Sequence, residues 1–236
     1  MSGRSIAHIL KREFKSYFLS PVAYIVISLF LIVTGWFFFS VFFIAGRTDL
    51  RDFFSMLPIV LAFAIPAITM RCYAEEIKSG SFEILLTLPV TQLEILLGKY
   101  MAALGFIVIM FIPTLSYPLF ISSLGDLDWG PVVGGYIGTV LLAGSFCAVG
   151  LLASSLTRNQ IVAFMIGLAI CFFLTIVDRM LIFFPTIITG VLQFIGADFH
   201  FRNISKGILD SRDLAYFLSL SFIALYGTHI VVKERG

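Results

Sequence analysis

Hydrophobic side chains fill six long stretches of the chain, and polar side chains gather in the segments between them. Each stretch holds about 20 residues, enough for a helix to cross the roughly 30 Å hydrocarbon core of a bilayer. The pattern therefore predicts an all-α polytopic membrane protein with one transmembrane domain over residues 1–236. The six expected spans are residues 22–45, 53–70, 99–122, 130–156, 160–177 and 214–232.

Positive charges flank these stretches unequally. Six spans put both termini on one side of the membrane, and the segments on that side hold ten Lys and Arg residues, against six on the opposite side. Four of those six lie in one long connector, Asp178–Asp213. Connectors rich in Lys and Arg stay in the cytoplasm, so we expect both termini to be cytoplasmic. On this topology every Glu is cytoplasmic and every Asp is external.

The N-terminal tail predicts an amphipathic helix that lies in the cytoplasmic headgroup layer. Its basic residues stand among apolar ones, and Pro21 breaks the helix before the first span. A plain basic anchor that only fixes the topology is the alternative interpretation. The apolar positions, which recur at helical spacing, include Ile6, Ile9, Leu10, Phe14 and Phe18.

The apolar segment Met180–Ile195 is interrupted by Pro185 and Gly190. We interpret it as short helices that dip into the outer leaflet of the membrane. The alternative is a seventh crossing, which would put the C-terminus outside.

Composition and charge narrow the possible functions. Hydrophobic residues make up 59% of the chain, and the mean hydropathy is +1.03. Charged residues make up only 13%, against about 25% in soluble domains. The net charge of +2 offers no large basic surface for nucleic acid. None of the six expected spans has a charged residue in its middle, which argues against ion-coupled transport and against a hydrolase within the membrane.

No catalytic or metal-binding pattern is present in the sequence. The three cysteines and three histidines are scattered without metal-ligand spacing, and the phosphate-binding loop G-x-x-x-x-G-K-[ST] does not occur. We therefore expect no catalytic site and no cofactor bound directly by the chain. If the protein does driven work, another chain supplies the energy.

The connector between the second and third spans is the most informative segment. Gly80 is an acceptable N-cap with Glu83 three residues later, so a short helix is expected over Ser81–Leu88, and Pro89 stops it. Thr91-Gln-Leu-Glu94 is a capping box that begins the next helix. A short rigid helix between two spans can fit a socket on a partner protein; an interfacial helix without a partner is the alternative.

Small residues open the fourth span at a spacing of four, at Gly130, Gly134 and Gly138, with Gly150 and Ser154 further along. This spacing lets helices approach closely. Packing within the chain and a dimer face are both compatible with it.

The connector resembles the coupling-helix signature of ABC-2 type permeases. This resemblance implies six spans, dimeric assembly and a separate cytoplasmic ABC ATPase that holds the ATP and Mg²⁺ and docks on the coupling helix. The N-terminal helix resembles the connecting helix of that family. The residues that carry the expected ATPase contact are Glu75, Glu76, Gly80, Ser81, Glu83, Leu86 and Pro89.

Further stretches resemble the gliding-motility-associated (GldF-like) branch of that family, and a nitrous-oxide-reductase maturation permease (NosY-like) is a more distant match. They include Pro66–Arg71, Asp128–Tyr136 and Ser154–Phe164. The resemblance implies a multi-pass permease of the bacterial inner membrane that exports a substrate or does envelope work such as gliding motility. A non-transporting scaffold driven by an ATPase is the alternative, for which a periplasmic accessory protein is a possible partner.

Overall fold

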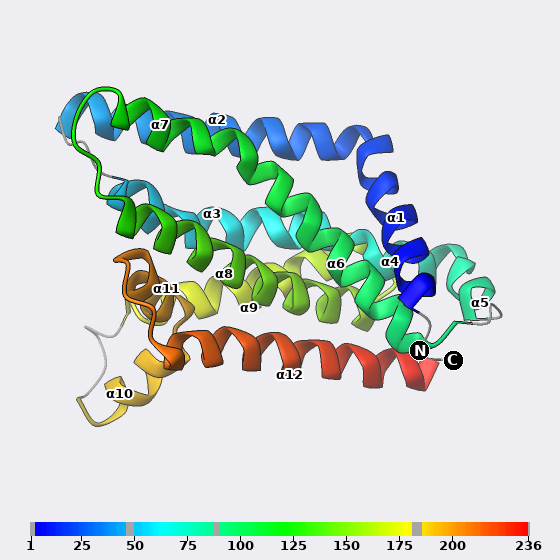
Figure 1. Cartoon of the computed structure of the whole chain (residues 1–236). Helices are drawn as coiled ribbons and strands as arrows, with labels where there is room; N and C mark the ends of the chain where they lie inside the picture. Colours follow the sequence, from blue (N-terminus) through cyan, green and yellow to red (C-terminus); the bar gives the residue numbers. More distant parts are fainter. Residues whose placement is uncertain (1–2, 46–49, 87–89, 181–185, 236) are drawn as a thin grey trace.

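The computed structural model of the chain describes residues 3–45, 50–86, 90–180 and 186–235, and all regular structure in these residues is helical (Figure 1). The expected all-α polytopic fold is confirmed. The long helices are α2 (Pro21–Ala45), α3 (Arg51–Thr69), α6 (Gln92–Phe111), α8 (Trp129–Leu156), α9 (Gln160–Ile176) and α12 (Ser211–Arg235). The other helices are α1 (Gly3–Leu19), α4 (Arg71–Ser79), α5 (Ser81–Leu86), the 3₁₀ helix η1 (Ile112–Leu115), α7 (Ser116–Ser122), α10 (Thr186–Ile195) and α11 (Ala197–Ser205).

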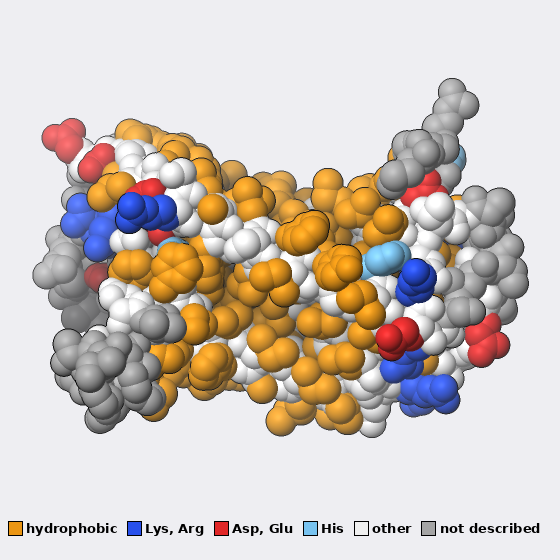
Figure 2. Space-filling view, turned by 90° about the horizontal axis from the view of Figure 1, so that it is seen from below, with side chains coloured by type: hydrophobic (Ala, Val, Ile, Leu, Met, Phe, Trp, Pro, Cys, Tyr) orange, Lys and Arg blue, Asp and Glu red, His pale blue; other side chains and the backbone are white. Residues whose placement is uncertain are grey.

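Among the described residues, five helical stretches are long and apolar enough to cross a membrane. The remaining predicted span, residues 160–177, corresponds to α9, whose 17 residues stand at the lower limit of about 17 for a crossing helix. Figure 2 shows the apolar surface as a belt between two ends that hold the charged side chains. The five stretches are Ala23–Phe43, Arg51–Ser79, Gln92–Ser122, Trp129–Leu156 and Ser211–Arg235.

Helix α8 is the centre of the bundle and packs against α3, α9, α11 and α12. Its small residues make this possible. A Cβ atom at Gly134 would lie 2.4 Å from the backbone oxygen of Ile204, and one at Gly150 would lie 2.0 Å from the Thr69 hydroxyl oxygen. A Cβ atom at Gly138 would lie 3.1 Å from the Ile204 side chain. At these positions the small residues serve packing within the chain, the first of the two interpretations.

Both termini lie at one end of the bundle, together with α1, α4 and α5, and the opposite end holds α7, α10 and α11 (Figure 1). The described part of the apolar segment Met180–Ile195 includes α10, a ten-residue helix at this opposite end. Pro185, expected to interrupt that segment, lies outside the described residues. Gly190, the second expected interruption, lies within α10 and is exposed.

Ion pairs between exposed arginines and buried carboxylates hold the opposite end together. Arg179 Nε donates to Asp198 Oδ2 over 2.9 Å, and Arg202 pairs with Asp178. Burial raises the pKa of Asp198, and the Arg179 guanidinium opposes that rise. His200, isolated along the sequence, is paired in the fold with Asp213, with 2.6 Å between Nδ1 and Oδ1. These contacts join the residues directly after α9 to α11, and α11 to α12.

We expect Gly134→Ala to destabilise the protein, because the new methyl group meets the rigid backbone of residue 204. Overpacking of this kind costs about 1–3 kcal/mol, so the midpoint of thermal unfolding in detergent should fall. Gly190→Ala is the matched control, since a Cβ atom there has nothing within 4 Å. Gly190→Ala should leave the midpoint of thermal unfolding unchanged or raise it slightly. Equal midpoints for the two variants would contradict this packing.

Candidate functional site at the α4–α5 segment

The α4–α5 segment, residues 71–86, turns sharply at Gly80. Gly80 has φ +74° and ψ 0°, the left-handed conformation that glycine adopts without a steric penalty from Cβ. The predicted start of the short helix at Ser81, with Gly80 directly before it, is confirmed, but Gly80 also ends α4 as its C-cap, a role that was not predicted. Its carbonyl accepts the backbone N–H of Glu83 over 3.3 Å.

Helix α5 buries one face and exposes the other. Phe82 and Leu85 are buried, and the Phe82 ring meets the ring of Tyr73 at 6.2 Å between centroids. Ser81 and Glu83, two of the predicted contact residues, are exposed. The apolar face thus fixes α5 to α4, and the polar face is available to another protein.

Two of the predicted contact residues fall where the structure is not described. Pro89 lies outside the described residues, as does the expected helix end at Leu88, and the side chain of Leu86 is not described either. The next predicted feature is confirmed. Thr91 and Glu94 form the capping box that begins α6, in which the Thr91 hydroxyl accepts from the Glu94 N–H and the Glu94 carboxylate accepts from the Thr91 N–H.

A buried ammonium group joins three helices at the base of the α4–α5 segment. Lys99 of α6 is only 1% exposed, and its Nζ donates to Oε1 of Glu76 in α4 over 2.6 Å. The same Nζ lies 3.4 Å from Oε1 of Glu13 in α1. A charge removed from water needs such partners, since desolvation alone is costly. Glu76 therefore points inward, whereas its neighbour Glu75 is 55% exposed.

Helix α1 lies against α6 rather than standing free. A Cβ atom at Gly98 would lie 2.6 Å from the Ile9 side chain, and one at Gly105 would lie 3.4 Å from the Phe14 ring. The apolar face that was expected to enter the headgroup layer is thus partly occupied by α6. All five predicted positions, Ile6, Ile9, Leu10, Phe14 and Phe18, are half-buried.

A serine of the central helix fixes the start of α4. The Ser154 hydroxyl of α8 donates to the Met70 carbonyl over 2.8 Å and accepts the backbone N–H groups of Tyr73 and Ala74 over 3.0 Å each. The first N–H groups of a helix have no partner within it, and Ser154 satisfies two of them. The base of α5 is therefore connected to α1, α6 and α8.

Sequence reasoning missed Lys99 and Ser154 as parts of this site. One signal was available for Lys99: the capping box at Thr91 begins the helix at Gln92, which places Lys99 about two turns inside it rather than at its edge. Among the described residues, no group of three His, Cys, Asp or Glu side chains is arranged to hold a metal ion. The segment consists of an exposed helix tip on a base fixed to three other helices.

Residues 7–222 match the family model described as ABC-2 family transporter protein. The chain belongs to the ABC-2 transporter family. A comparison with curated proteins gives no match. As an ABC-2 permease, the chain is a multi-pass membrane subunit of an ABC transporter, and such permeases generally pair with a cytoplasmic ABC ATPase.

We expect Lys99→Met to destabilise the ABC-2 permease by about 3–5 kcal/mol, since it leaves two carboxylates without their buried cation. Thermal unfolding in detergent measures the change. Adding Glu76→Met should recover part of the loss, because fewer unpaired charges remain buried. Lys78→Met is the matched control, because Lys78 is exposed in the same helix as Glu76. If Lys99→Met and Lys78→Met unfolded at the same temperature, the contacts of Lys99 would not stabilise the packing of α1, α4 and α6.

Proposed function

We propose that a separate cytoplasmic ABC ATPase docks on α5 and drives this permease through the α4–α5 segment. One observation carries the proposal. The exposed tip of α5, with Ser81 and Glu83, stands on a base that Lys99 and Ser154 tie to the rest of the bundle. Force applied at the tip reaches membrane helices without passing through a flexible loop.

The path of the force follows from the contacts. A displacement of α4 moves Glu76, and the 2.6 Å contact with Lys99 passes the movement to α6. Glu13 carries it on to α1. The Ser154 hydrogen bonds pass it to α8, the most buried of the membrane-spanning stretches. ATP and Mg²⁺ act on the ATPase, and this chain contributes the docking surface and the moving helices.

The finer parts of the proposal come from the resemblance of the sequence. We propose that the permease works as a dimer, with itself or a related permease, in the bacterial inner membrane with both termini in the cytoplasm. The driven process is export of a substrate or work on the cell envelope such as gliding motility, for which a periplasmic accessory protein is a candidate partner. In the scaffold alternative the same docking drives that work without transport.

The docking proposal predicts that Glu83→Lys reduces recovery of the co-expressed ATPase in a pull-down about tenfold, because it reverses a charge on the exposed face of α5. Gly80→Ala should weaken recovery as well, since the left-handed backbone that aims α5 becomes strained. Glu234→Lys, an exposed charge reversal at the same end of the bundle, should leave recovery unchanged. Full recovery with Glu83→Lys and Gly80→Ala would refute docking at α5.

The orientation can be tested by cysteine labelling, because the three native cysteines are buried. Ser81→Cys lies at the end of the bundle that holds the termini, and Ser123→Cys lies exposed near the opposite end. In spheroplasts, an impermeant maleimide should label Ser123→Cys before lysis and Ser81→Cys only after lysis. The reverse pattern would place α5 outside the cell, where no cytoplasmic ATPase can reach it.

A further inference from the structure

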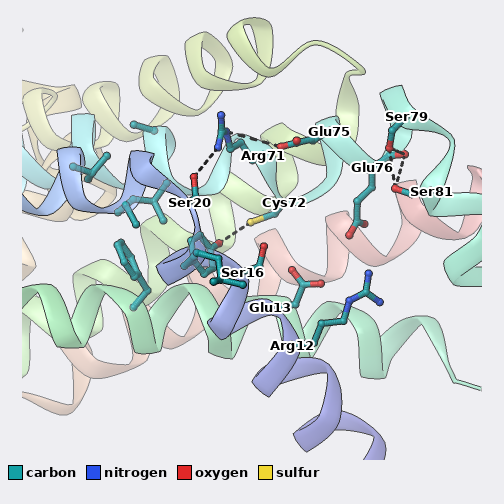
Figure 3. Close-up of a pocket in the computed structure, with 17 residues that line it drawn as sticks. Arg12, Glu13, Ser16, Ser20, Arg71, Cys72, Glu75, Glu76, Ser79 and Ser81 are labelled. Carbon is teal, nitrogen blue, oxygen red and sulfur yellow. Dashed lines mark hydrogen bonds and ion pairs between the residues drawn. The ribbon is translucent and has the colours of Figure 1, made fainter.

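A cleft of about 560 Å³ opens between α1 and α4, next to the Lys99 cluster (Figure 3). Its lining changes character along its length. One part is polar, with arginines, glutamates and serines from α1, α4 and α5. The other part is apolar and lies between α2, α3 and α6, where Ala23, Val26, Ala67 and Ile68 line it. The cleft is therefore amphipathic and begins where the membrane-spanning part of α3 ends.

The polar part of the cleft contains two groups with unused hydrogen-bonding capacity. Arg71 donates once to Ser20 Oγ over 3.3 Å and comes no closer than 3.9 Å to Glu75, and its Nε is buried without an acceptor among the described residues. Glu76 accepts from Lys99 with Oε1, and its Oε2 is buried without a donor among the same residues. The cleft lacks an acceptor at Arg71 and a donor at Glu76.

The charges around the cleft balance. Three cations and three carboxylates stand in or beside it, so a free anion gains no net attraction. A ligand that carries both charges satisfies both groups, because its anion accepts from Arg71 and its cation donates to Glu76. The cations are Arg12, Arg71 and Lys99, and the carboxylates are Glu13, Glu75 and Glu76.

We propose that this cleft binds one phospholipid with an ethanolamine headgroup. The phosphodiester accepts from Arg71 beside Ser20, the primary ammonium donates to Glu76 Oε2, and the acyl end of the lipid lies along Ala67 and Ile68. A choline headgroup carries no N–H and leaves Glu76 without a donor. The inference rests on the membrane location and on the cleft, and it does not require an ATPase to dock at α5.

Native mass spectrometry of the full-length protein in detergent, titrated separately with phosphatidylethanolamine, phosphatidylcholine and phosphatidylglycerol, tests this site. We expect one phosphatidylethanolamine to bind about tenfold more tightly than either other lipid. Arg71→Gln should weaken this binding about tenfold, because a neutral amide replaces the cation that meets the phosphate. Ala67→Phe, which fills the apolar part without changing charge, should weaken it too.

Two further variants make the test specific. Glu76→Gln should remove the preference for ethanolamine over choline, since the ammonium loses its carboxylate partner. Arg158→Gln is the matched control, because Arg158 is exposed between α8 and α9 and does not line the cleft. It should bind lipid like the unmodified protein. Thermal unfolding of each variant separates loss of the site from loss of the fold.

Three results would overturn the proposal. Equal binding of ethanolamine and choline lipids would show that the Glu76 carboxylate accepts no hydrogen bond from the headgroup. Unchanged binding by folded Arg71→Gln and Ala67→Phe would place the lipid elsewhere. Soluble phosphorylethanolamine bound as tightly as the lipid would make the ligand a free phosphate ester rather than a membrane lipid. None of these results bears on recovery of the ATPase by α5, so the two proposals fail separately.

Discussion

The position of Lys99 constrains the whole end of the bundle that holds the termini. An ammonium group that is 1% exposed is tolerated only with its partners in place. Helix α1 must therefore cross α6 closely enough for Glu13 to reach Nζ, and Gly98 and Gly105 provide that closeness. Helix α4 must in turn bring Glu76 to the same atom. The left-handed turn at Gly80 then leaves α5 as the part that projects.

Both ends of the permease are stabilised by ion pairs, which different residues form at each end. Carboxylates of Glu and the ammonium of Lys99 meet at the end that holds the termini, whereas Asp178, Asp198 and Asp213 meet arginines and a histidine at the other. An apolar belt separates them (Figure 2). Close-packed interiors have low compressibility, so a bundle closed by ion pairs at both ends resists compression along its length.

The features predicted from the sequence were those set by local chemistry. Apolar runs located the spans, Thr91 and Glu94 located the start of α6, and Pro21 located the start of α2, because each depends on residues a few positions apart. Gly80 was correctly placed directly before α5, but its second role as the C-cap of α4 was missed, because no separate helix over Arg71–Ser79 was predicted.

The candidate site itself was only partly predictable. Its exposed tip lies in one short stretch of sequence, whereas its base depends on contacts between distant residues. Lys99 and Glu76 are 23 positions apart, and Ser154 and Met70 are 84 apart. No local pattern reports such pairings. His200 and Asp213 show the same limit at the other end, 13 positions apart and brought together by the turn between α11 and α12.

The contact at Gly134 has a consequence for how the permease changes shape. There the backbone of α8 faces the carbonyl of Ile204 with no side chain between them. Such an interface cannot shift register, since any sliding drives main-chain atoms into one another. If the permease changes shape, α8 and α11 must then move as a single body, and relative motion has to occur where side chains rather than main-chain atoms line the contact between helices.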